Sequence, residues 1–286
     1  MKVLILGAKG QLGRAVIDQC QVAHISFTAY GRADLDITHL EALKKIIGKN
    51  KFTHIINCAA YTNVDLAETE AHQAYECNAQ GPENIGKVAK EEGLFVVHVS
   101  TDYIFDGKKK APYKEEDRAN PLNVYGKSKW EGELRLLEQL PSACIVRTSW
   151  VFGHYGKNFI SAVMHMLKSH TQIKAIEDQV NRATYNRDLA QALIDLSCHS
   201  GIFHFANETP LTRYQIVQDF YRMAKENKVP ILCEEIVPVS ASAFASLSLR
   251  PKNTVLCTEK VTSVLGRKPR LWETVLKEYF DVAAHP

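Results

Sequence analysis

The N-terminal strand and the glycines that follow it leave few folds open to this chain. Residues 2–6 are an apolar run of strand length, and an amphipathic stretch of helical period covers residues 11–21. Between and inside them stand glycines at positions 7, 10 and 13, which let the backbone turn tightly and approach a pyrophosphate at the helix N-terminus. The pattern predicts a dinucleotide-binding loop, with candidate cofactor contacts at Gly7, Gly10, Gln11, Leu12 and Gly13.

Strands and helices alternate through the first half of the chain. The strand candidates are apolar on both faces, which is typical of a sheet covered by helices on both sides. Repeated strand–helix units favour a parallel sheet with right-handed crossovers. We therefore expect an α/β chain with a Rossmann-type, doubly wound parallel sheet. Its further strands are expected at residues 25–30, 53–58, 95–99 and 143–147, and its further helices at 39–49, 69–92 and 125–140.

The alternation loosens after about residue 150. We expect residues 1–150 to form an NAD(P)-binding Rossmann domain, to which later segments return. Residues 151–286 are expected mainly to form a smaller α+β C-terminal substrate lobe, with a cleft at the carboxyl ends of the strands. In this part the expected helices are 158–169, 187–199, 211–227 and 272–282, with a strand at 202–206 and a stretch rich in Pro and Ser at 238–248.

Composition excludes several classes of protein. With 286 residues, 45% hydrophobic and 23% charged, the chain has the make-up of an ordinary globular protein of one or two domains. Its formal charge, 35 minus 32 or +3, does not favour nucleic-acid binding, and no apolar run approaches the roughly 18 residues that span a membrane. Seven cysteines without a Cys-x-x-Cys pair, and no signal-peptide pattern, predict a cytoplasmic protein with reduced thiols. No metal is expected, because His199 and His204 beside Cys198 lack the spacing of a metal site.

The end of the second expected strand bears on the choice of cofactor. NAD-specific proteins usually place an acidic residue there, which binds the ribose 2′-hydroxyl. This chain has Tyr30, Gly31 and Arg32 instead. Arg32 is either a surface arginine or a partner for a 2′-phosphate, so the sequence favours NADPH, with NADH possible.

Thr101, Tyr125 and Lys129 form a candidate catalytic group. Thr101 lies just beyond the fourth expected strand, and Tyr125 and Lys129, four residues apart, share a face of the next helix. A lysine ammonium beside the phenol is expected to lower its pKa from about 10, so that Tyr125 can protonate an alkoxide while Thr101 hydrogen-bonds the same oxygen. Tyr221 and Lys225 have the same spacing, but no strand ending in Ser or Thr precedes them, so we interpret that pair as structural.

Longer motifs add a family resemblance. Beyond the glycine loop, they read DIT at 36–38, NCAAYTNVD at 57–65, VSTDYIFDG at 99–107, NVYGKSK at 123–129, RTSWVFG at 147–153 and RPKN at 250–253. With them the chain resembles the extended short-chain dehydrogenases/reductases and, among these, the dTDP-4-dehydrorhamnose reductase family, from residue 1 to about 280. The strings around Thr62 and Trp150 are specific to this family, whereas the glycine loop is common to the superfamily.

The resemblance implies a reaction and roles for residues. The reaction is the NADPH-dependent reduction of the C4 ketone of dTDP-4-dehydro-6-deoxy-L-mannose (dTDP-4-dehydrorhamnose) to dTDP-L-rhamnose, a precursor of cell-surface polysaccharides. Thr101, Tyr125 and Lys129 would be catalytic, the latter two also contacting the cofactor. Other implied cofactor contacts are Asp36, Ile37, Ala59, Ala60 and Tyr61. The implied substrate contacts are Thr62, Val64, Thr101, Tyr103, Trp150, Asn158 and Arg250.

The chain departs from the family pattern at two places. Where the family usually reads Asp-Gln-x-Gly-x-Pro-Thr, this chain has DQVNRAT at 178–184, and losing the Gly and Pro is expected to change a loop near the substrate lobe. Ala15 stands where some members carry the glutamate of a metal-bridged dimer. We therefore expect a monomer or weak homodimer.

Two other functions remain open. A non-catalytic, NADP-binding regulatory subunit of the methionine adenosyltransferase partner type resembles the same superfamily, but it lacks the Ala-Tyr-Thr and Thr-Ser-Trp strings present here. A different sugar-nucleotide reductase or epimerase is the other alternative. A 4,6-dehydratase is disfavoured, because Tyr103 stands where dehydratases usually place a glutamate.

Overall fold

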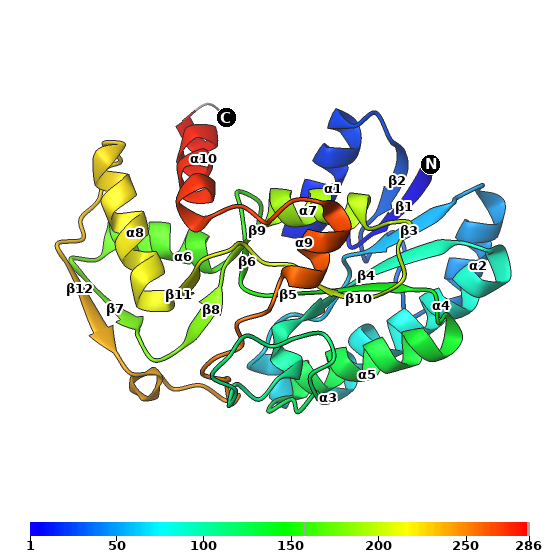
Figure 1. Cartoon of the computed structure of the whole chain (residues 1–286), viewed down its shortest axis with the longest axis horizontal. Coiled ribbons are helices and arrows are strands. Elements are labelled where there is room, and N and C mark those ends of the chain that lie inside the picture. The colour runs from blue at the N-terminus through cyan, green and yellow to red at the C-terminus, as the bar shows by residue number, and fades with distance from the viewer. Residues whose placement is uncertain (157, 285–286) are drawn as a thin grey trace.

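A six-stranded parallel sheet is the centre of the computed structural model, which describes residues 1–156 and 158–284 (Figure 1). The strand order is β10-β5-β4-β3-β1-β2. The order runs outward in both directions from the junction of β1 and β3, which is the doubly wound pattern and confirms the expected Rossmann-type α/β class. The strands are β1 (Lys2–Leu6), β2 (Ser26–Tyr30), β3 (His54–Asn57), β4 (Phe95–Thr101), β5 (Cys144–Thr148) and β10 (Gly201–His204).

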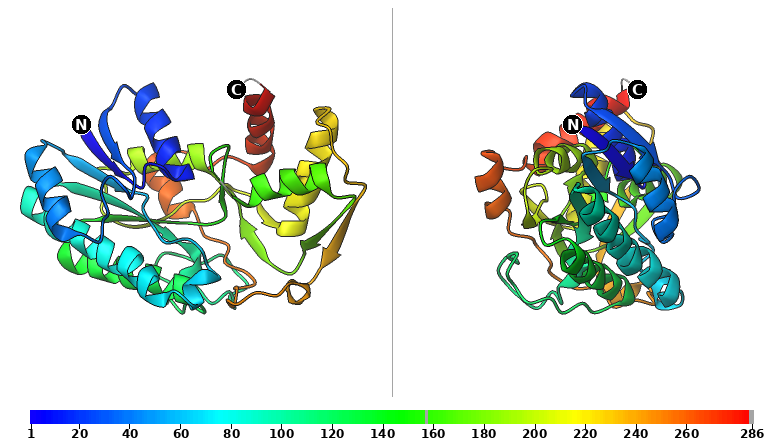
Figure 2. Two further views of the ribbon diagram at one scale, coloured as in Figure 1. Left: turned by 180° about the vertical axis from the view of Figure 1, so that it is seen from behind. Right: turned by 90° about the vertical axis from the view of Figure 1, so that its right-hand side faces the viewer.

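Helices cover both faces of the sheet, because side chains along each strand point alternately to opposite faces. Val3 and Ile5 of β1 pack into a core with α1, α7 and α9. Leu4 and Leu6 pack into the opposite core with α2, α4 and α5 (Figures 1 and 2). These helices are α1 (Gln11–Val22), α2 (Leu40–Lys49), α4 (Gly81–Glu92), α5 (Val124–Gln139), α7 (Asn186–Asp195) and α9 (Glu259–Leu265).

The helical region expected at 69–92 is formed by several pieces and not by one regular α-helix. Short pieces lead directly into α4, which ends at Gly93 in the left-handed conformation with φ 66°. Side chains of Gln73, Glu76 and Cys77 from these pieces line a cleft at the sheet edge. The pieces are η1 (Leu66–Glu68), α3 (Ala71–Tyr75) and a π-helical turn, η2 (Glu76–Gln80).

After β5 the chain builds a smaller lobe around Phe152, Phe220 and Trp272, seen on the left in Figure 1. Strands β7 and β12 pair in parallel, β8 and β11 pair antiparallel, and β6 pairs with β9, which confirms the expected α+β lobe. Its elements are β6 (Val151–Phe152), α6 (Phe159–Ser169), β7 (Gln172–Ile176), β8 (Val180–Arg182), β9 (Thr184–Tyr185), β11 (Pro210–Thr212), α8 (Arg213–Glu226), β12 (Glu235–Val239), η4 (Ala241–Ala243) and α10 (Trp272–Ala284).

Residues 178–184, where the sequence departs from the family pattern, were expected to form a loop, but they also contain strand residues. They include β8 and the first residue of β9, and they place the side chain of Asn181 in the interior, 1% exposed. The expectation was wrong because β8 pairs with β11, which begins 28 residues after β8 ends, and local turn composition does not report such pairing.

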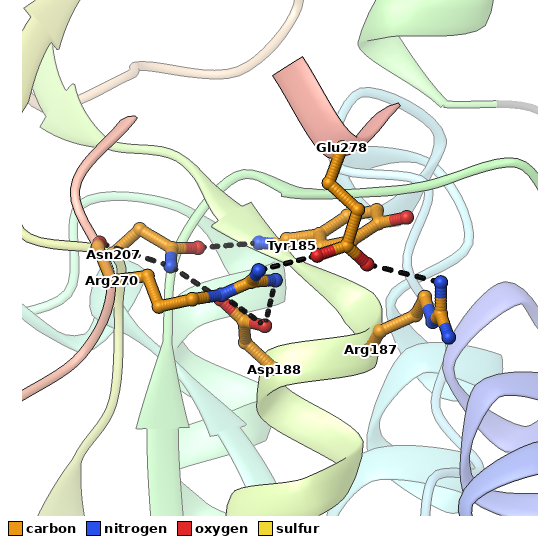
Figure 3. A network of polar contacts seen from close by, with 6 residues as sticks. All are labelled: Tyr185, Arg187, Asp188, Asn207, Arg270 and Glu278. Carbon is orange, nitrogen blue, oxygen red and sulfur yellow. Dashed lines mark hydrogen bonds and ion pairs between the residues drawn. The ribbon is translucent and has the colours of Figure 1, made fainter. Parts of the chain in front are cut away.

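An ion-pair network ties the lobe to the sheet (Figure 3). Arg270 contacts the carboxylate of Asp188 on α7, with Nε 3.0 Å from Oδ2, and it also pairs with Glu278 on α10. Arg187 Nη1 lies 3.0 Å from Glu278 Oε1.

Two elements after residue 150 return to the first part of the fold. Strand β10 is the edge strand of the six-stranded sheet, and helix α7 packs against that sheet. Within the described ranges, no helix combines the length and apolar character needed to cross a membrane.

Candidate active site

Two adjoining clefts lie at the carboxyl ends of the parallel strands, where ligands bind in open α/β sheets. The first has a volume of about 440 Å³ and is lined by the glycine loop, the end of β2 and the segment after β3. The second, of about 480 Å³, is lined by Thr101, Tyr125, Lys129 and Trp150. Lys9, Gly10 and residues after β3 line both clefts, so a cofactor bound in the first can extend into the second.

The glycine loop has the close backbone packing that a dinucleotide site needs. Gly7 has φ 77°, and a Cβ there would lie 2.5 Å from the backbone nitrogen of Ala59. A Cβ at Gly13 would lie 2.3 Å from the carbonyl oxygen of Gly7. Gly10 precedes α1 without a side-chain cap, so the amide groups of the first turn and the positive end of the helix dipole can meet a phosphate.

Charged side chains line the first cleft beside the chain that follows β2. Arg32, whose side chain is 79% exposed, donates from Nε to Asp36 Oδ2 at 3.1 Å. Burial alone would raise the pKa of Asp36, but hydrogen bonds from Thr38 and Arg32 lower it, so Asp36 is anionic at neutral pH. Arg32, Asp36 and Ile37, all candidate cofactor contacts, line this cleft together with Lys9. Lys9 was not among the predicted cofactor residues, although its position between Gly7 and Gly10 of the glycine loop could have indicated it.

The second cleft brings together the three candidate catalytic residues. Thr101 ends β4, and Tyr125 lies in the first turn of α5, which Asn123 caps by accepting from the backbone N–H of Gly126 at 2.8 Å. A Cβ at Gly126 would lie 2.2 Å from the carbonyl oxygen of Tyr103, so this glycine lets α5 pack against the chain after β4. Lys129 follows one turn later and is 2% exposed.

Burial and local contacts set the protonation of the lysine. The Nζ of Lys129 donates to the carbonyl oxygen of Val99 at 2.7 Å and lies 3.4 Å from His98 Nε2. Burial lowers the pKa of Lys129 to about 8. Burial and then the lysine charge hold the pKa of His98 well below its usual value, so His98 stays neutral beside Lys129.

The expected lowering of the Tyr125 pKa is wrong for this structure. Burial raises the pKa of the phenol, the nearby Asp102 and Tyr103 raise it further, and only the Thr101 hydroxyl opposes the rise. Tyr125 is therefore protonated at neutral pH.

Trp150 forms a wall of the second cleft in a strained conformation. Its φ of 42° lies in the left-handed region, which costs a bulky residue about 1–3 kcal/mol. The guanidinium carbon of Arg213 lies 4.4 Å from the centre of the Trp150 ring and 4.8 Å from that of Phe159, so the arginine stacks on both aromatic rings. Sequence reasoning missed Arg213, because no motif around it marks a site.

A third cleft, of about 480 Å³, lies in the lobe. Arg213, Arg250 and Asp65 line it together with apolar side chains, and Arg250 Nη2 lies 2.8 Å from Asp65 Oδ2. Two cations beside an apolar wall suit a phosphate attached to a base or sugar. Arg250 was among the residues predicted to contact substrate, and it lies in this cleft.

Of the other residues predicted to contact substrate, only some line a cleft. Thr62 lines the first and second clefts. Tyr103 is buried and its ring meets that of Tyr125 edge to face, with 5.8 Å between centroids. Asn158 caps α6, accepting from Ser161 N and donating to the carbonyl oxygen of Gly153. None of the described residues that line the three clefts is Tyr103, Val64 or Asn158.

The remaining cofactor candidates follow the same geometry. Ala59, Ala60 and Tyr61 line the first cleft directly after β3. Gln11 and Leu12, at the start of α1, line the second cleft. A dinucleotide loop and a Thr–Tyr–Lys group at one edge of a parallel sheet define the class of short-chain dehydrogenases/reductases.

Comparison with known proteins gives the family. The chain belongs to the RmlD substrate binding domain family, which matches residues 1–284. It is 36% identical to a dTDP-4-dehydrorhamnose reductase of Aggregatibacter actinomycetemcomitans over 96% of this chain and 97% of that protein. A solved dTDP-4-dehydrorhamnose reductase of Clostridium acetobutylicum has a TM-score of 0.93 and 34% identity, covering 99% and 100% of the two chains. One from Bacillus anthracis, solved in complex with NADP, has a TM-score of 0.92 and 30% identity, covering 98% and 99%.

Proposed function

We propose that this chain uses NADPH to reduce the C4 ketone of dTDP-4-dehydrorhamnose to dTDP-L-rhamnose. The observation that carries the proposal is the meeting of Thr101, Tyr125 and Lys129 in a cleft that adjoins the glycine loop. The names of full-length relatives support the substrate, and the NADP complex of a relative at 30% identity supports the cofactor.

The cofactor would be held along the first cleft. The amide groups at the start of α1 suit its pyrophosphate, and Gly7 and Gly13 let the loop pack closely against neighbouring backbone, which fixes its shape. Arg32 would bind the 2′-phosphate, with Asp36 and Ile37 beside the adenine. When bound, NADPH supplies the hydride for the ketone carbon.

Tyr125 would supply the proton for the ketone oxygen. Its raised pKa keeps the phenol protonated at neutral pH, so a proton is available at every turnover. Lys129, charged below pH about 8, would stabilise the phenolate that remains and hold the nicotinamide ribose. Thr101 would hydrogen-bond the substrate oxygen.

The substrate would extend from the second cleft into the third. Trp150 and Thr62 would contact the deoxysugar, and Arg213 and Arg250 would bind the diphosphate. We assign no substrate contact to Asn158, because its amide group is engaged in capping α6. Residues 1–150, with α7 and β10, would form the cofactor-binding part and most of 151–286 the substrate lobe. We further propose that the enzyme is cytoplasmic and a monomer or weak homodimer.

The test is a turnover assay with product analysis. The purified chain is mixed with NADPH and with dTDP-4-dehydrorhamnose supplied by an upstream epimerase. We expect loss of NADPH absorbance only when the keto sugar is present, and a product that co-elutes with dTDP-L-rhamnose. NADPH binding without turnover would favour the regulatory-subunit alternative, and a C4 epimer as product would favour a different sugar-nucleotide reductase.

A further inference from the structure

A buried carboxylate adjoins the candidate catalytic threonine and has no part in the steps described above. Asp102 directly follows Thr101, is 2% exposed and lines the second cleft. It begins the short helix η3 (Asp102–Ile104). Its Oδ1 accepts from the Thr101 hydroxyl at 3.1 Å. Its Oδ2 accepts from Asn181 Nδ2 at 2.7 Å and from the Thr254 hydroxyl at 2.5 Å.

The lobe fixes which oxygen of Asp102 can carry a proton. Asn181 Oδ1 accepts from the backbone N–H of Arg182 at 2.8 Å, so the amide must present Nδ2 to Asp102. Asn181 Nδ2 also donates to Thr254 Oγ1 at 2.8 Å, so the hydroxyl proton of Thr254 is directed to Asp102 Oδ2. With two donors on Oδ2, a proton on Asp102 must reside on Oδ1, which faces Thr101.

The hydrogen-bond capacity of Thr101 then gives two arrangements. A hydroxyl group has one proton to donate and two acceptor positions. The backbone N–H of Tyr103 occupies one acceptor position of Thr101 at 3.2 Å. When Asp102 is ionised, it accepts the Thr101 proton, and the hydroxyl can only accept in the cleft. When Asp102 is protonated on Oδ1, it donates to Thr101, whose own proton is free to turn into the cleft.

We propose that Asp102 is a positioning residue of the reduction, which determines whether the Thr101 hydroxyl donates a hydrogen bond to the ketone oxygen. This inference depends on the proposed function for its substrate. A donor at that oxygen stabilises the negative charge that develops during hydride transfer, so the protonated form of Asp102 is the form that favours reduction.

The surroundings of Asp102 place its titration in an accessible range. Burial raises the pKa of Asp102 to about 6, although hydrogen bonds from Thr254, Asn181 and Thr101 oppose the rise. The ionisable groups that face it are Tyr103 in η3, Tyr125 on α5 and Arg213 on α8.

These neighbours keep one charge state around pH 6. Burial raises the pKa of both phenols, which stay neutral, and an arginine stays charged. Lys129, elsewhere in the cleft, loses its charge only near pH 8. A change of rate near pH 6 can therefore be assigned to Asp102 through its variants.

The first test is the dependence of kcat on pH between 5 and 7.5, at saturating NADPH and keto sugar. We expect the wild-type kcat to be highest at pH 5, to fall with a midpoint near pH 6 and to be at least about tenfold lower at pH 7.5, a modest part of the cost of losing one oxyanion donor. In Asp102→Asn, the amide oxygen must accept from Asn181 and Thr254, so the amide nitrogen faces Thr101 and donates to it. This variant should keep the low-pH rate throughout the range.

The second test reverses the direction of the hydrogen bond between positions 102 and 181. In the double variant Asp102→Asn/Asn181→Asp, the new carboxylate at position 181 needs donors, so the amide nitrogen at position 102 turns toward it. The amide oxygen then accepts the Thr101 proton. The double variant should have a kcat at least about tenfold below that of Asp102→Asn at every pH, with the polar side chains of this network still paired.

Controls separate positioning from folding. Asp106→Asn removes a carboxylate on the same segment that accepts from Tyr113 and Asn120, and it should keep the wild-type profile. Melting curves show whether each variant folds. Equal rates in the single and double variants, or a wild-type kcat that is flat from pH 5 to 7.5, would overturn the proposal. If Asp102→Asn does not fold, a wild-type profile that is flat from pH 5 to 7.5 still overturns the proposal. A wild-type chain that never oxidises NADPH with the keto sugar would refute the proposed function instead.

Discussion

Helices α5 and α8 each carry a tyrosine followed four residues later by a lysine, but the two pairs have different surroundings. On α5, Tyr125 and Lys129 line a cleft, and the lysine is 2% exposed and donates to a backbone carbonyl. On α8, the hydroxyl of Tyr221 lies 3.4 Å from the carbonyl oxygen of Glu234, and the exposed Lys225 sits with Nζ 4.2 Å from the centre of the Tyr221 ring. The same spacing gives a candidate proton donor in one place and a surface contact in the other.

The difference comes from what precedes each helix. Helix α5 follows β4, whose carboxyl end reaches the cleft, and its glycines let it lie close to its neighbours. A Cβ at Gly132 would lie 1.9 Å from the carbonyl oxygen of Asn78. Helix α8 follows the short strand β11 and buries other residues, such as Phe220. Position at the end of a central strand, more than spacing along a helix, therefore distinguishes the candidate catalytic pair from the surface pair.

The largest expected effect comes from removing the phenol hydroxyl of the α5 pair. Tyr125→Phe should lower kcat by at least about a hundredfold, the scale of a lost general acid, while the fold and NADPH affinity are kept. Steady-state kinetics measure the change, and Tyr221→Phe is the matched control, expected to alter kcat less than about twofold because it loses only an exposed hydrogen bond. Similar losses in both variants would end the distinction between the two helices.

The lysines should differ in their effect on the pH profile. Lys129 carries its charge below pH about 8 and loses it above, so the wild-type kcat/KM should fall as the pH rises through that value. Lys129→Met should lower kcat/KM at pH 7 by about thirtyfold and remove this limb. Lys225→Met should leave both unchanged. A limb near pH 8 that persists without Lys129 would assign the titration to another group.

A third prediction concerns the wall beside the α5 pair. Trp150→Ala should raise KM for the keto sugar and lower kcat, together about tenfold in kcat/KM, because a loosely held sugar is poorly oriented for hydride transfer. NADPH affinity should stay within about threefold, a difference below about 1 kcal/mol. Kinetics, a cofactor titration and a melting curve distinguish the outcomes. Unfolding would make Trp150 a core residue, and normal turnover would place the sugar elsewhere.

The smallest expected effect comes from replacing Arg32, which lines the first cleft. Arg32→Ala should weaken NADPH binding by about 1 kcal/mol, or about fivefold, because the side chain is exposed and its gain is screened by water. NADH binding should be almost unchanged. Equal weakening of NADPH and NADH binding, measured by titration, would show that Arg32 supports the loop through Asp36 and does not bind the 2′-phosphate.

The sheet and its strand-end residues could be predicted from sequence because their signals are local. An apolar run of strand length, a glycine that tolerates φ 77° and a strand ending in Thr101 are each visible within a few residues. Parallel pairing of the strands then brings Thr101, Tyr125 and the glycine loop to one edge of the sheet.

The lobe was harder to predict because its contacts are distant in sequence. Strand β12 pairs with β7 across 63 positions, and Asn181 reaches Asp102 across 79. The stacking of Arg213 on Trp150 has no sequence signature. The capping role of Asn158 was predictable, because Ser161 stands at the matching position of a capping box. The direction of the Tyr125 pKa depends on burial, which spacing does not report.

The most direct test of the central claim is to follow the hydride. NADPH deuterated on the transferred position of the nicotinamide is incubated with the keto sugar and with wild-type chain, Tyr125→Phe or Tyr221→Phe. Mass spectrometry and NMR of the nucleotide sugar report where deuterium appears. We predict one deuterium at C4 of dTDP-L-rhamnose with the wild type and Tyr221→Phe, formed at least about a hundredfold more slowly with Tyr125→Phe. A wild-type product without deuterium at C4, or equal rates in all three, would contradict a reductase whose proton comes from Tyr125.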